Sequence, residues 1–328
     1  MIKQKIFITG GAGYVGSVLI PKLLKEGNQI TVLDLMIYGE NVLPENKNLI
    51  KVKGDIRNTS ILEKYIPGHD TVIHLACISN DPSFEMNPLL GRSINYDAFE
   101  PLIKISKENN IKRFIYASSS SVYGIKSENN VHEQMSLKPL TDYSIFKAKC
   151  EKILAKYEDE SFTTVTIRPA TVCGFAPRQR LDVVVNILTN LAFHERKMKV
   201  FGGSQLRPNI HIEDMADAYI ALIEAPKNKI AGEIFNVGST NHSVNEISMI
   251  VKNVIGHDVS VINIPTEDNR SYHISSEKIK KILEFETKFT IEDAALDLKK
   301  AFETKKLVNP LQNEFYFNIK RMNSIDMV

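Results

Sequence analysis

Two residues that could move a proton stand one helical turn apart, because Tyr143 and Lys147 are four positions apart. On a helix such residues share one face. An unperturbed tyrosine titrates at about 10, which is too high for a base at neutral pH. Nearby positive charge favours the phenolate and lowers this pKa. Ser119, from a preceding serine run, would donate a hydrogen bond to the same substrate oxygen. We therefore predict that Tyr143 takes a proton from a substrate hydroxyl while hydride leaves the same carbon.

A glycine loop near the start of the chain supplies a place for the hydride acceptor. An apolar run at residues 2–9 leads into Gly10, Gly13 and Gly16, and apolar residues at helical spacing follow. A strand that passes through glycines into a helix is the context of a dinucleotide fingerprint. Gly10 permits the turn, Gly13 lets the backbone approach the pyrophosphate, and Gly16 lets the helix pack on the strand. The free N–H groups of the first helical turn would then face the phosphates.

An acid at the end of the next strand favours NAD over NADP. Residues 29–33 form a second apolar strand, and Asp34 follows it, 18 residues beyond Gly16. A carboxylate at this place bonds the ribose diol and repels a 2′-phosphate. Bound NAD would also add the positive charge of its oxidised ring to that of Lys147, and both would lower the pKa of Tyr143. Lys147 would also bond the nicotinamide ribose.

The elements that position these residues alternate along the first half of the chain. Apolar strands are expected at 50–52, 71–75, 114–117 and 163–167, with helices at 60–66 and 143–157 between them. This alternation predicts an α/β fold with a doubly wound parallel sheet of the Rossmann type. The polar stretch at 126–130, within residues 118–142, is expected to form an active-site loop.

The second half is expected to form a smaller substrate lobe. Helices are predicted near 181–195, 213–224, 244–255 and 290–303. We predict an NAD-binding domain at 1–170 and a lobe at 171–328, with a return segment near 231–240. The 328 residues suffice for two such units.

Bulk properties exclude several classes of protein. A net charge of +2 gives no reason to expect nucleic acid or a membrane surface as a partner. No apolar run approaches the roughly 20 residues that span a bilayer, and no signal peptide precedes the first strand, so a cytoplasmic location is expected. The three cysteines have no metal-like spacing, and no metal is expected. Cys77 and Cys173 are expected to be buried structural thiols.

Ordered motifs resemble those of the extended short-chain dehydrogenase/reductases, specifically the NAD-dependent nucleotide-sugar epimerase/dehydratase family. The resemblance extends over nearly the whole chain, and its motifs are residues 9–16, 54–56, 74–76, 118–124 and the Tyr143/Lys147 pair. It implies a set of cofactor-binding residues: Gly10, Gly13, Tyr14, Val15, Gly16, Asp34, Asp55, Ile56, Leu75, Ala76, Asn95, Tyr143 and Lys147. It also implies that Asn95 supports the active-site helix and that the catalytic hydroxyl is Ser119.

The same resemblance bears on the substrate. Family members that eliminate water carry an Asp-Glu pair after the catalytic hydroxyl, whereas this chain has Ser120 and Ser121, so a 4,6-dehydratase is not expected. Arg207 and Arg270 are similar to two arginines that bind the nucleotide diphosphate, for which paired charge-assisted hydrogen bonds suit a guanidinium. Relatives often carry Asp where this chain has Pro208 and Tyr272.

A basic cluster and one threonine complete the predicted substrate contacts. Residues 178–182 resemble a subgroup of nucleotide-sugar C4 dehydrogenases, some acting on GDP-heptoses. Arg178 and Arg180 would hold a phosphate or a charged sugar substituent, or form a solvated helix start. Thr171 is also expected to contact substrate. His211 is expected to be a packed, hydrogen-bonded residue rather than a catalytic acid.

Taken together, these features predict an NAD-dependent nucleotide-sugar epimerase that oxidises C4 transiently, through a 4-keto sugar. The nearest alternative is a C4 dehydrogenase or ketoreductase with the same residues. A third is a catalytically silent relative that binds a nucleotide or a partner protein. The resemblance further implies a homodimer in which helices near 95–109 and 143–157 pair, although Pro101 would interrupt the first of them.

Overall fold

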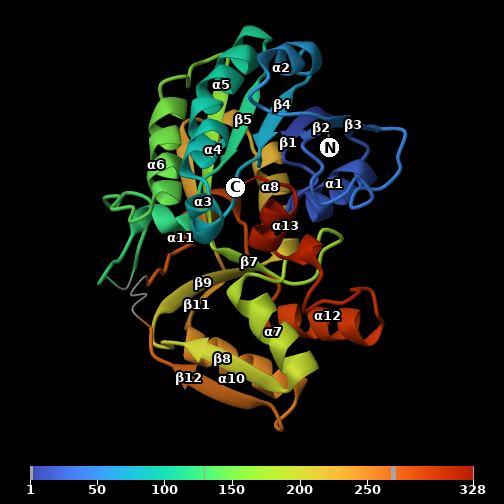
Figure 1. The fold of residues 1–328 in the computed structure, drawn as a ribbon. Coiled ribbons are helices and arrows are strands. Elements are labelled where there is room, and N and C mark those ends of the chain that lie inside the picture. The colour runs from blue at the N-terminus through green and yellow to red at the C-terminus, as the bar shows by residue number, and fades with distance from the viewer. Residues whose placement is uncertain (1–2, 129, 267–270, 328) are drawn as a thin grey trace.

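A computed structural model describes residues 3–128, 130–266 and 271–327. Its centre is a seven-stranded sheet in which every neighbouring pair of strands is parallel. In order across the sheet, the strands are β10 (Glu233–Val237), β6 (Thr163–Pro169), β5 (Arg113–Ala117), β4 (Thr71–His74), β1 (Lys5–Thr9), β2 (Gln29–Asp34) and β3 (Leu49–Lys53). Helices cover both faces, which confirms the predicted doubly wound α/β fold (Figure 1).

The strand order reverses beside β1, and this reversal fixes where a ligand can bind. The chain moves outward from β1 to β2 and β3, then returns to β4 on the other side of β1 and continues to β5 and β6. The connections that leave β1 and β4 therefore diverge and open a crevice at the carboxyl ends of the strands.

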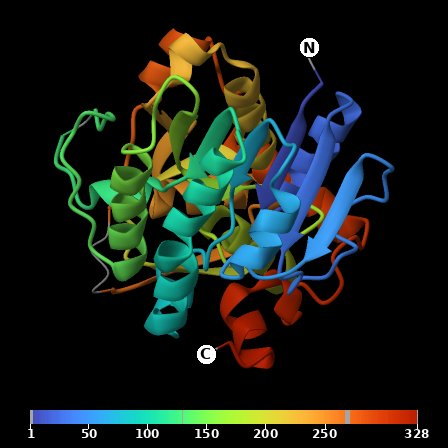
Figure 2. The same cartoon turned by 90° about the horizontal axis from the view of Figure 1, so that it is seen from above.

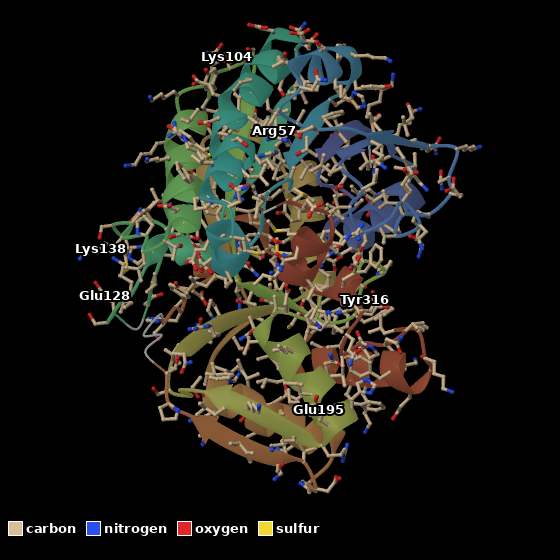
Figure 3. All side chains as sticks on the ribbon, viewed as in Figure 1. Arg57, Lys104, Glu128, Lys138, Glu195 and Tyr316 are labelled. Carbon is tan, nitrogen blue, oxygen red and sulfur yellow. The ribbon has the colours of Figure 1, made fainter. Side chains whose placement is uncertain are left out.

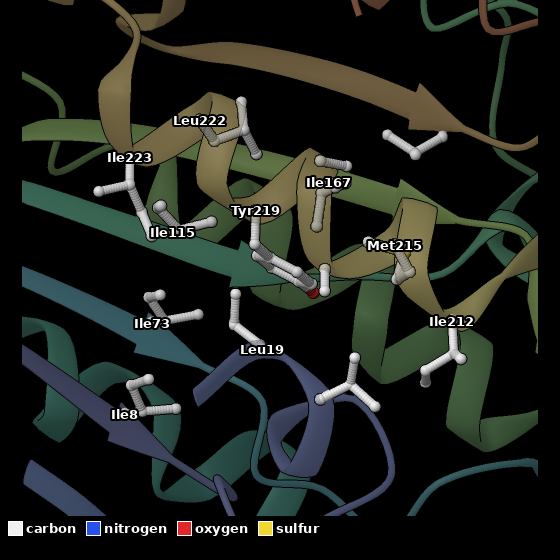
Figure 4. Close-up of a cluster of buried hydrophobic side chains, with 14 of the residues drawn as sticks. Ile8, Leu19, Ile73, Ile115, Ile167, Ile212, Met215, Tyr219, Leu222 and Ile223 are labelled. Atoms are coloured by element: carbon white, nitrogen blue, oxygen red, sulfur yellow. The ribbon is translucent and has the colours of Figure 1, made fainter. Parts of the chain in front are cut away.

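Two helical layers bury the two faces of the sheet (Figure 2). Alternate residues of a strand point to opposite faces, so Ile6 and Ile8 of β1 join one hydrophobic cluster and Phe7 joins the other. The first face is covered by α1 (Gly16–Lys25) and α8 (Ile212–Glu224), and the second by α2 (Thr59–Tyr65), α5 (Phe99–Glu108) and α6 (Asp142–Leu154). Figure 4 shows Tyr219 and Leu222 of α8 above the strand residues Ile73 and Ile115.

A second, smaller layer lies below the carboxyl ends of the sheet (Figure 1). It contains a three-stranded sheet of β11 (Thr240–Ser243), β9 (Leu206–His211) and β7 (Thr171–Cys173), and a parallel pair, β12 (Ser260–Ile264) and β8 (Lys197–Phe201). The helices α7 (Val184–Glu195), α10 (Val244–Ile255) and α12 (Ile291–Glu303) pack on one another, and their bounds confirm the helices predicted there.

Segments from the second half return to the central sheet. β10 pairs with β6 at its edge, and α8 packs against α1. Apolar residues of α8 continue the core formed by the first half, as a helix with one broad apolar stripe does. The last helix, α13 (Asn318–Ser324), contacts α3 (Asp81–Glu85), so the C-terminal segment lies at the junction of the two layers (Figure 1).

The helix predicted at 95–109 is divided, but not by Pro101. A π-helix, η1 (Ser93–Asp97), precedes α5, and Pro101 is the third residue of α5. The predicted interruption was wrong, because a proline in the first helical turn removes an N–H that has no partner within the helix.

The remaining elements are short. They are α4 (Pro88–Arg92), α9 (Lys227–Ile230), α11 (Glu277–Leu283) and the 3-10 helices η2 (Ser120–Tyr123) and η3 (Glu314–Tyr316). Among the described residues, no helix is long and apolar enough to cross a membrane.

Candidate active site

A cavity of about 500 Å³ opens at the carboxyl ends of the central strands. Its lining contains most of the residues that the sequence singled out: Gly10, Gly13, Tyr14, Val15, Gly16, Asp34, Asp55, Ile56, Leu75, Ala76, Ser119, Tyr143, Lys147, Thr171, Arg178, Arg180 and Arg207. Asn95 is absent from this lining, and Arg270 lies outside the described residues. The fold thus joins the glycine loop, the Tyr/Lys pair and the basic residues of the lobe in one space.

The glycine loop has the shape that a dinucleotide requires. Gly10 adopts a φ of +72°, and a Cβ built there would lie 2.4 Å from the backbone nitrogen of Ala76. A Cβ on Gly16 would lie 2.2 Å from the carbonyl oxygen of Gly11, so only glycine lets α1 begin this close to the loop. The start of α1 therefore lies close to the loop, in the arrangement that lets a helix N-terminus face a pyrophosphate.

Asp34 is held at the end of β2 by the loop itself. Its carboxylate accepts hydrogen bonds from the backbone N–H groups of Ala12, at 3.0 Å, and Met36, at 2.8 Å. Burial raises the pKa of Asp34, while these two N–H groups and the charge of Arg178 lower it. An oriented carboxylate in this position fits the ribose diol of NAD.

Ser119, Tyr143 and Lys147 face the cavity from two adjoining elements. Tyr143 and Lys147 lie on α6, whose first turn is capped by the Thr141 side chain. The Lys147 ammonium donates to the carbonyl oxygen of Ala117, at 2.6 Å, and lies 5.8 Å from the centroid of the Tyr143 ring. Ser119 follows β5, and its Oγ lies 2.8 Å from Oγ of Ser121. A hydroxyl, a phenol and an ammonium thus surround one part of the cavity.

The groups of the protein itself raise the pKa of Tyr143. Burial raises the pKa of Tyr143, and the nearby Cys77 and Asp81 raise it further. The charge of Arg180 and a hydrogen bond with Ser119 lower it, but burial outweighs both. Lys147 directs its ammonium to a backbone carbonyl, which anchors the lysine to β5.

A buried polar network fixes the catalytic helix to the sheet. Arg168 of β6 forms an ion pair with Glu151 of α6, at 2.6 Å, and both side chains are about 4% exposed or less. Ser118 donates to the same carboxylate, and Arg168 also donates to the hydroxyl of Tyr123, at 2.7 Å. Because the two charges of the pair neutralise each other, the pair can hold Ser118 and α6 in fixed positions beside Tyr143 and Lys147.

Asn95 supports the cavity wall from behind rather than lining it. Its side-chain oxygen accepts from the N–H of Ile78, at 2.8 Å, and its amide donates to the carbonyl of Ile78, at 3.0 Å. The carbonyl of Asn95 accepts from the thiol of Cys150 on α6. Asn95 therefore braces the segment after β4 against the active-site helix.

The substrate side of the cavity is formed by the lobe. Arg207 lies on β9, and its guanidinium is 5.6 Å from the ring centroid of Tyr272, one of the departures from the family pattern. Thr171 lies on β7, opposite Asn209 of β9. Arg180 forms an ion pair with Asp182, at 2.6 Å, and donates to the hydroxyl of Ser79.

Three further expectations can be compared with the structure. Cys173 is buried, as predicted, but Cys77 is partly exposed and lines the cavity. Of the polar stretch at 126–130, the described residues 126–128 and 130 do not line the cavity, and Glu128 lies at the outer edge of the molecule (Figure 3). His211 is packed as predicted: it caps α8 through Nδ1 and stacks on Phe289.

No sequence motif predicted the residues that the C-terminal segment contributes to the cavity. Asn318, Met322 and Met327 line the cavity, as does Tyr38 in the loop after β2. No motif marks them, and only the packing of α13 brings them to the site. Within the described residues, no group of three or more His, Cys, Asp or Glu lies together in a way that could hold a metal ion.

Comparison with known proteins agrees with this geometry. Residues 6–238 match the model of the NAD dependent epimerase/dehydratase family. The chain is 28% identical to a UDP-glucose 4-epimerase of Lactobacillus helveticus over 78% of this chain and 83% of that protein. It is 25% identical to a dTDP-glucose 4,6-dehydratase of Streptomyces niveus, over 90% and 91% of the two chains.

A solved structure shows the same likeness in three dimensions. The UDP-N-acetylglucosamine 4-epimerase from Methanobrevibacter ruminantium, in complex with UDP-N-acetylmuramic acid, superposes with a TM-score of 0.84 at 25% identity, covering 93% of this chain and all of that one. The chain therefore belongs to the NAD-dependent epimerase/dehydratase family, whose members act on nucleotide sugars.

Proposed function

We propose that this enzyme is a nucleotide-sugar 4-epimerase that oxidises C4 transiently, with Ser119, Tyr143 and Lys147 as its catalytic residues. The observation that carries the proposal is the single cavity that holds these three residues, the glycine loop and Arg207. NAD bound along the loop supplies the acceptor, and then the donor, of the C4 hydride. Asp34, Gly10, Gly13 and Gly16 would hold its adenosine and phosphates.

The proposed proton transfer starts at the sugar's 4-hydroxyl. Ser119 donates a hydrogen bond to that oxygen and orients it, and Tyr143 takes its proton as the C–H bond at C4 breaks. A 4-keto sugar and a protonated Tyr143 result. For the return, the keto sugar turns in the cavity, C4 receives hydride on its other face, and Tyr143 returns the proton to the oxygen. Arg207 would retain the diphosphate during this rotation.

Ser120 and Ser121 support epimerisation over dehydration. Both lie in the cavity, in the positions where the resemblance places the acids of a dehydratase. A serine hydroxyl is too weak an acid to protonate a leaving hydroxide. The likeness to a UDP-glucose 4-epimerase supports the same choice.

A net C4 dehydrogenase or ketoreductase is the second candidate, because residues 178–182 resemble such enzymes. Incubation of the purified protein with UDP-, GDP-, dTDP- and CDP-sugars that carry deuterium at C4 separates the two. The epimerase converts a sugar to its 4-epimer without added oxidant and keeps the deuterium at C4. A stable keto sugar with reduced cofactor would contradict the proposal and support the dehydrogenase.

A further inference from the structure

Arg178 lies where the lobe meets the glycine loop. Its backbone N–H donates to Oγ of Ser17, at 3.2 Å, and Ser17 is the second residue of α1. The first turn of α1 is the part of a Rossmann domain that faces the cofactor's phosphates. The positive charge of Arg178 also lowers the pKa of Asp34, so it is felt at the acid that faces the ribose.

The Arg178 guanidinium is buried without a direct ion pair among the described residues, although the charges of Asp34 and Asp182 act on it. The residue is 4% exposed, and its guanidinium carbon lies 3.6 Å from the centroid of the Tyr38 ring. Among the described residues, no carboxylate lies within ion-pair distance of it, and its Nε has no hydrogen-bond partner. A buried charge without a partner is strongly unfavourable. Arg178 also lines the cavity, so an anion bound there would neutralise it.

Asn318 holds this guanidinium in place. Its side-chain oxygen accepts from Nη2 of Arg178, at 2.6 Å, and from the hydroxyl of Tyr38, at 2.9 Å. Its amide donates to Oγ of Ser79, at 2.9 Å, and its backbone N–H donates to Asp182, at 2.8 Å. Asn318 is 3% exposed and begins α13. Asn318 thus connects three segments that line the cavity: the loop after β2, the segment after β4, and residues 178–182.

Arg180 lies in a different environment although it is two residues away. It has a carboxylate partner in Asp182, and its charge lowers the pKa of Tyr143. Arg180 therefore faces the reaction centre, whereas Arg178 faces the loop and Asp34. The two arginines, which the sequence grouped as substrate contacts, remain close enough for their charges to interact, but they have different partners: Arg180 pairs with Asp182, and Arg178 bonds Asn318.

We infer that Arg178 binds the pyrophosphate of NAD rather than the substrate, and that Asn318 is a positioning residue that presents it. The pyrophosphate would lie between the N–H groups of the glycine loop on one side and the guanidinium on the other. A planar guanidinium suits two phosphoryl oxygens through paired charge-assisted hydrogen bonds. The C-terminal segment thereby contributes to cofactor retention. This inference concerns the cofactor alone and is independent of the reaction catalysed.

Binding measurements on Arg178→Met test the inference. Methionine keeps an apolar stem against Tyr38 and removes the charge. The affinities of three ligands for cofactor-depleted protein would be measured by calorimetry. ADP-ribose contains the pyrophosphate of the cofactor, and adenosine lacks it. UDP carries the diphosphate of the substrate. We expect ADP-ribose to bind about 10- to 100-fold more weakly, since hydrogen bonds to charged groups contribute roughly 1.5–3 kcal/mol. Adenosine and UDP should bind as they do to wild type.

Arg207→Met is the matched control from the opposite side of the same cavity, and it should weaken UDP and spare ADP-ribose. Asn318→Ala keeps the charge but frees the guanidinium, and it should weaken ADP-ribose several-fold and lower the NAD content of the purified protein. If circular dichroism shows that Arg178→Met does not fold, the binding measurements on Asn318→Ala test the inference instead.

Any one of three other results would overturn the inference. Unchanged ADP-ribose affinity in both variants would show that the guanidinium does not reach the pyrophosphate. A loss for UDP as large as that for ADP-ribose would assign Arg178 to the substrate. An equal loss for adenosine would mean that Arg178 shapes the adenosine pocket through Tyr38 instead.

Discussion

The surroundings of Tyr143 oppose its ionisation, so a tyrosine base at this position needs further positive charge nearby. Burial, Cys77 and Asp81 all raise its pKa, and Arg180 and Ser119 only partly offset them. In the proposed reaction, the positive charge of the oxidised nicotinamide ring would supply the remaining stabilisation of the phenolate.

We expect Tyr143→Phe to lower kcat by about 10²–10⁴-fold, the range for loss of a positioned acid–base group. NAD content, measured by absorbance and mass spectrometry, should not change. Because the base must be ionised and its pKa is raised, kcat/KM of the wild type should rise with pH. Tyr157→Phe is the control, since its hydroxyl only bonds Glu100 away from the cavity. Unchanged turnover in Tyr143→Phe would contradict the role and revive the silent-relative alternative.

The proposed catalytic residues depend on buried polar groups that tie helices to strands. Glu151 and Arg168 connect α6 to β6, and Asn95 connects the segment after β4 to α6. His74, the last residue of β4, bonds Thr9 of β1 at 2.7 Å and stacks on Tyr116 of β5. Such groups fix the relative positions of neighbouring elements because each has few alternative partners once buried.

His74 should make stability depend on pH. Burial lowers its pKa from 6.5 to about 3, and the charge of Lys147 adds to this effect. Between these values the unfolded chain binds a proton that the folded chain does not, so stability is lost as pH falls below about 6.5. We expect the free energy of unfolding to fall by about 2 kcal/mol from this residue between pH 7 and pH 5.

Chemical denaturation across this pH range would check the value. His74→Asn should be less stable at pH 7 but show a shallower pH dependence than wild type. His257→Asn, on an exposed turn, should keep the wild-type slope. An identical slope in His74→Asn would mean that other histidines with lowered pKa values, the partly buried His69 and the buried His211, carry the effect.

Segments that are distant along the chain come together to form the cavity. The cavity lies between the central sheet and the lobe, and α13 closes it from one side (Figure 1). The chain crosses between the two layers more than once, through α8, β10 and α13. Cofactor binding should therefore stabilise both layers together, as any ligand of the folded state does.

We also propose a homodimer formed through α5 and α6. Light scattering after size exclusion should give twice the chain mass of 37.0 kDa. Ile153 is a partly buried residue of α6, and Ile153→Arg should shift the mass toward one chain while circular dichroism shows that the chain still folds. Ile262→Arg, on the exposed β12 of the lobe, is the control. A single-chain mass for the wild type would contradict the proposal.

The local sequence was sufficient for the elements and the family. A glycine that needs positive φ, an acid at a strand end and alternating apolar runs act through near neighbours, so their spacing alone predicted the sheet, α1 and α6, and NAD. The environment of a buried group depends on tertiary packing, which the spacing of residues along the sequence does not encode. Tertiary structure therefore decided the raised pKa of Tyr143, the place of Asn95 behind the cavity wall, and the different partners of Arg178 and Arg180. It also brought Asn318 to the cavity, through hydrogen bonds to residues 136 to 280 positions away.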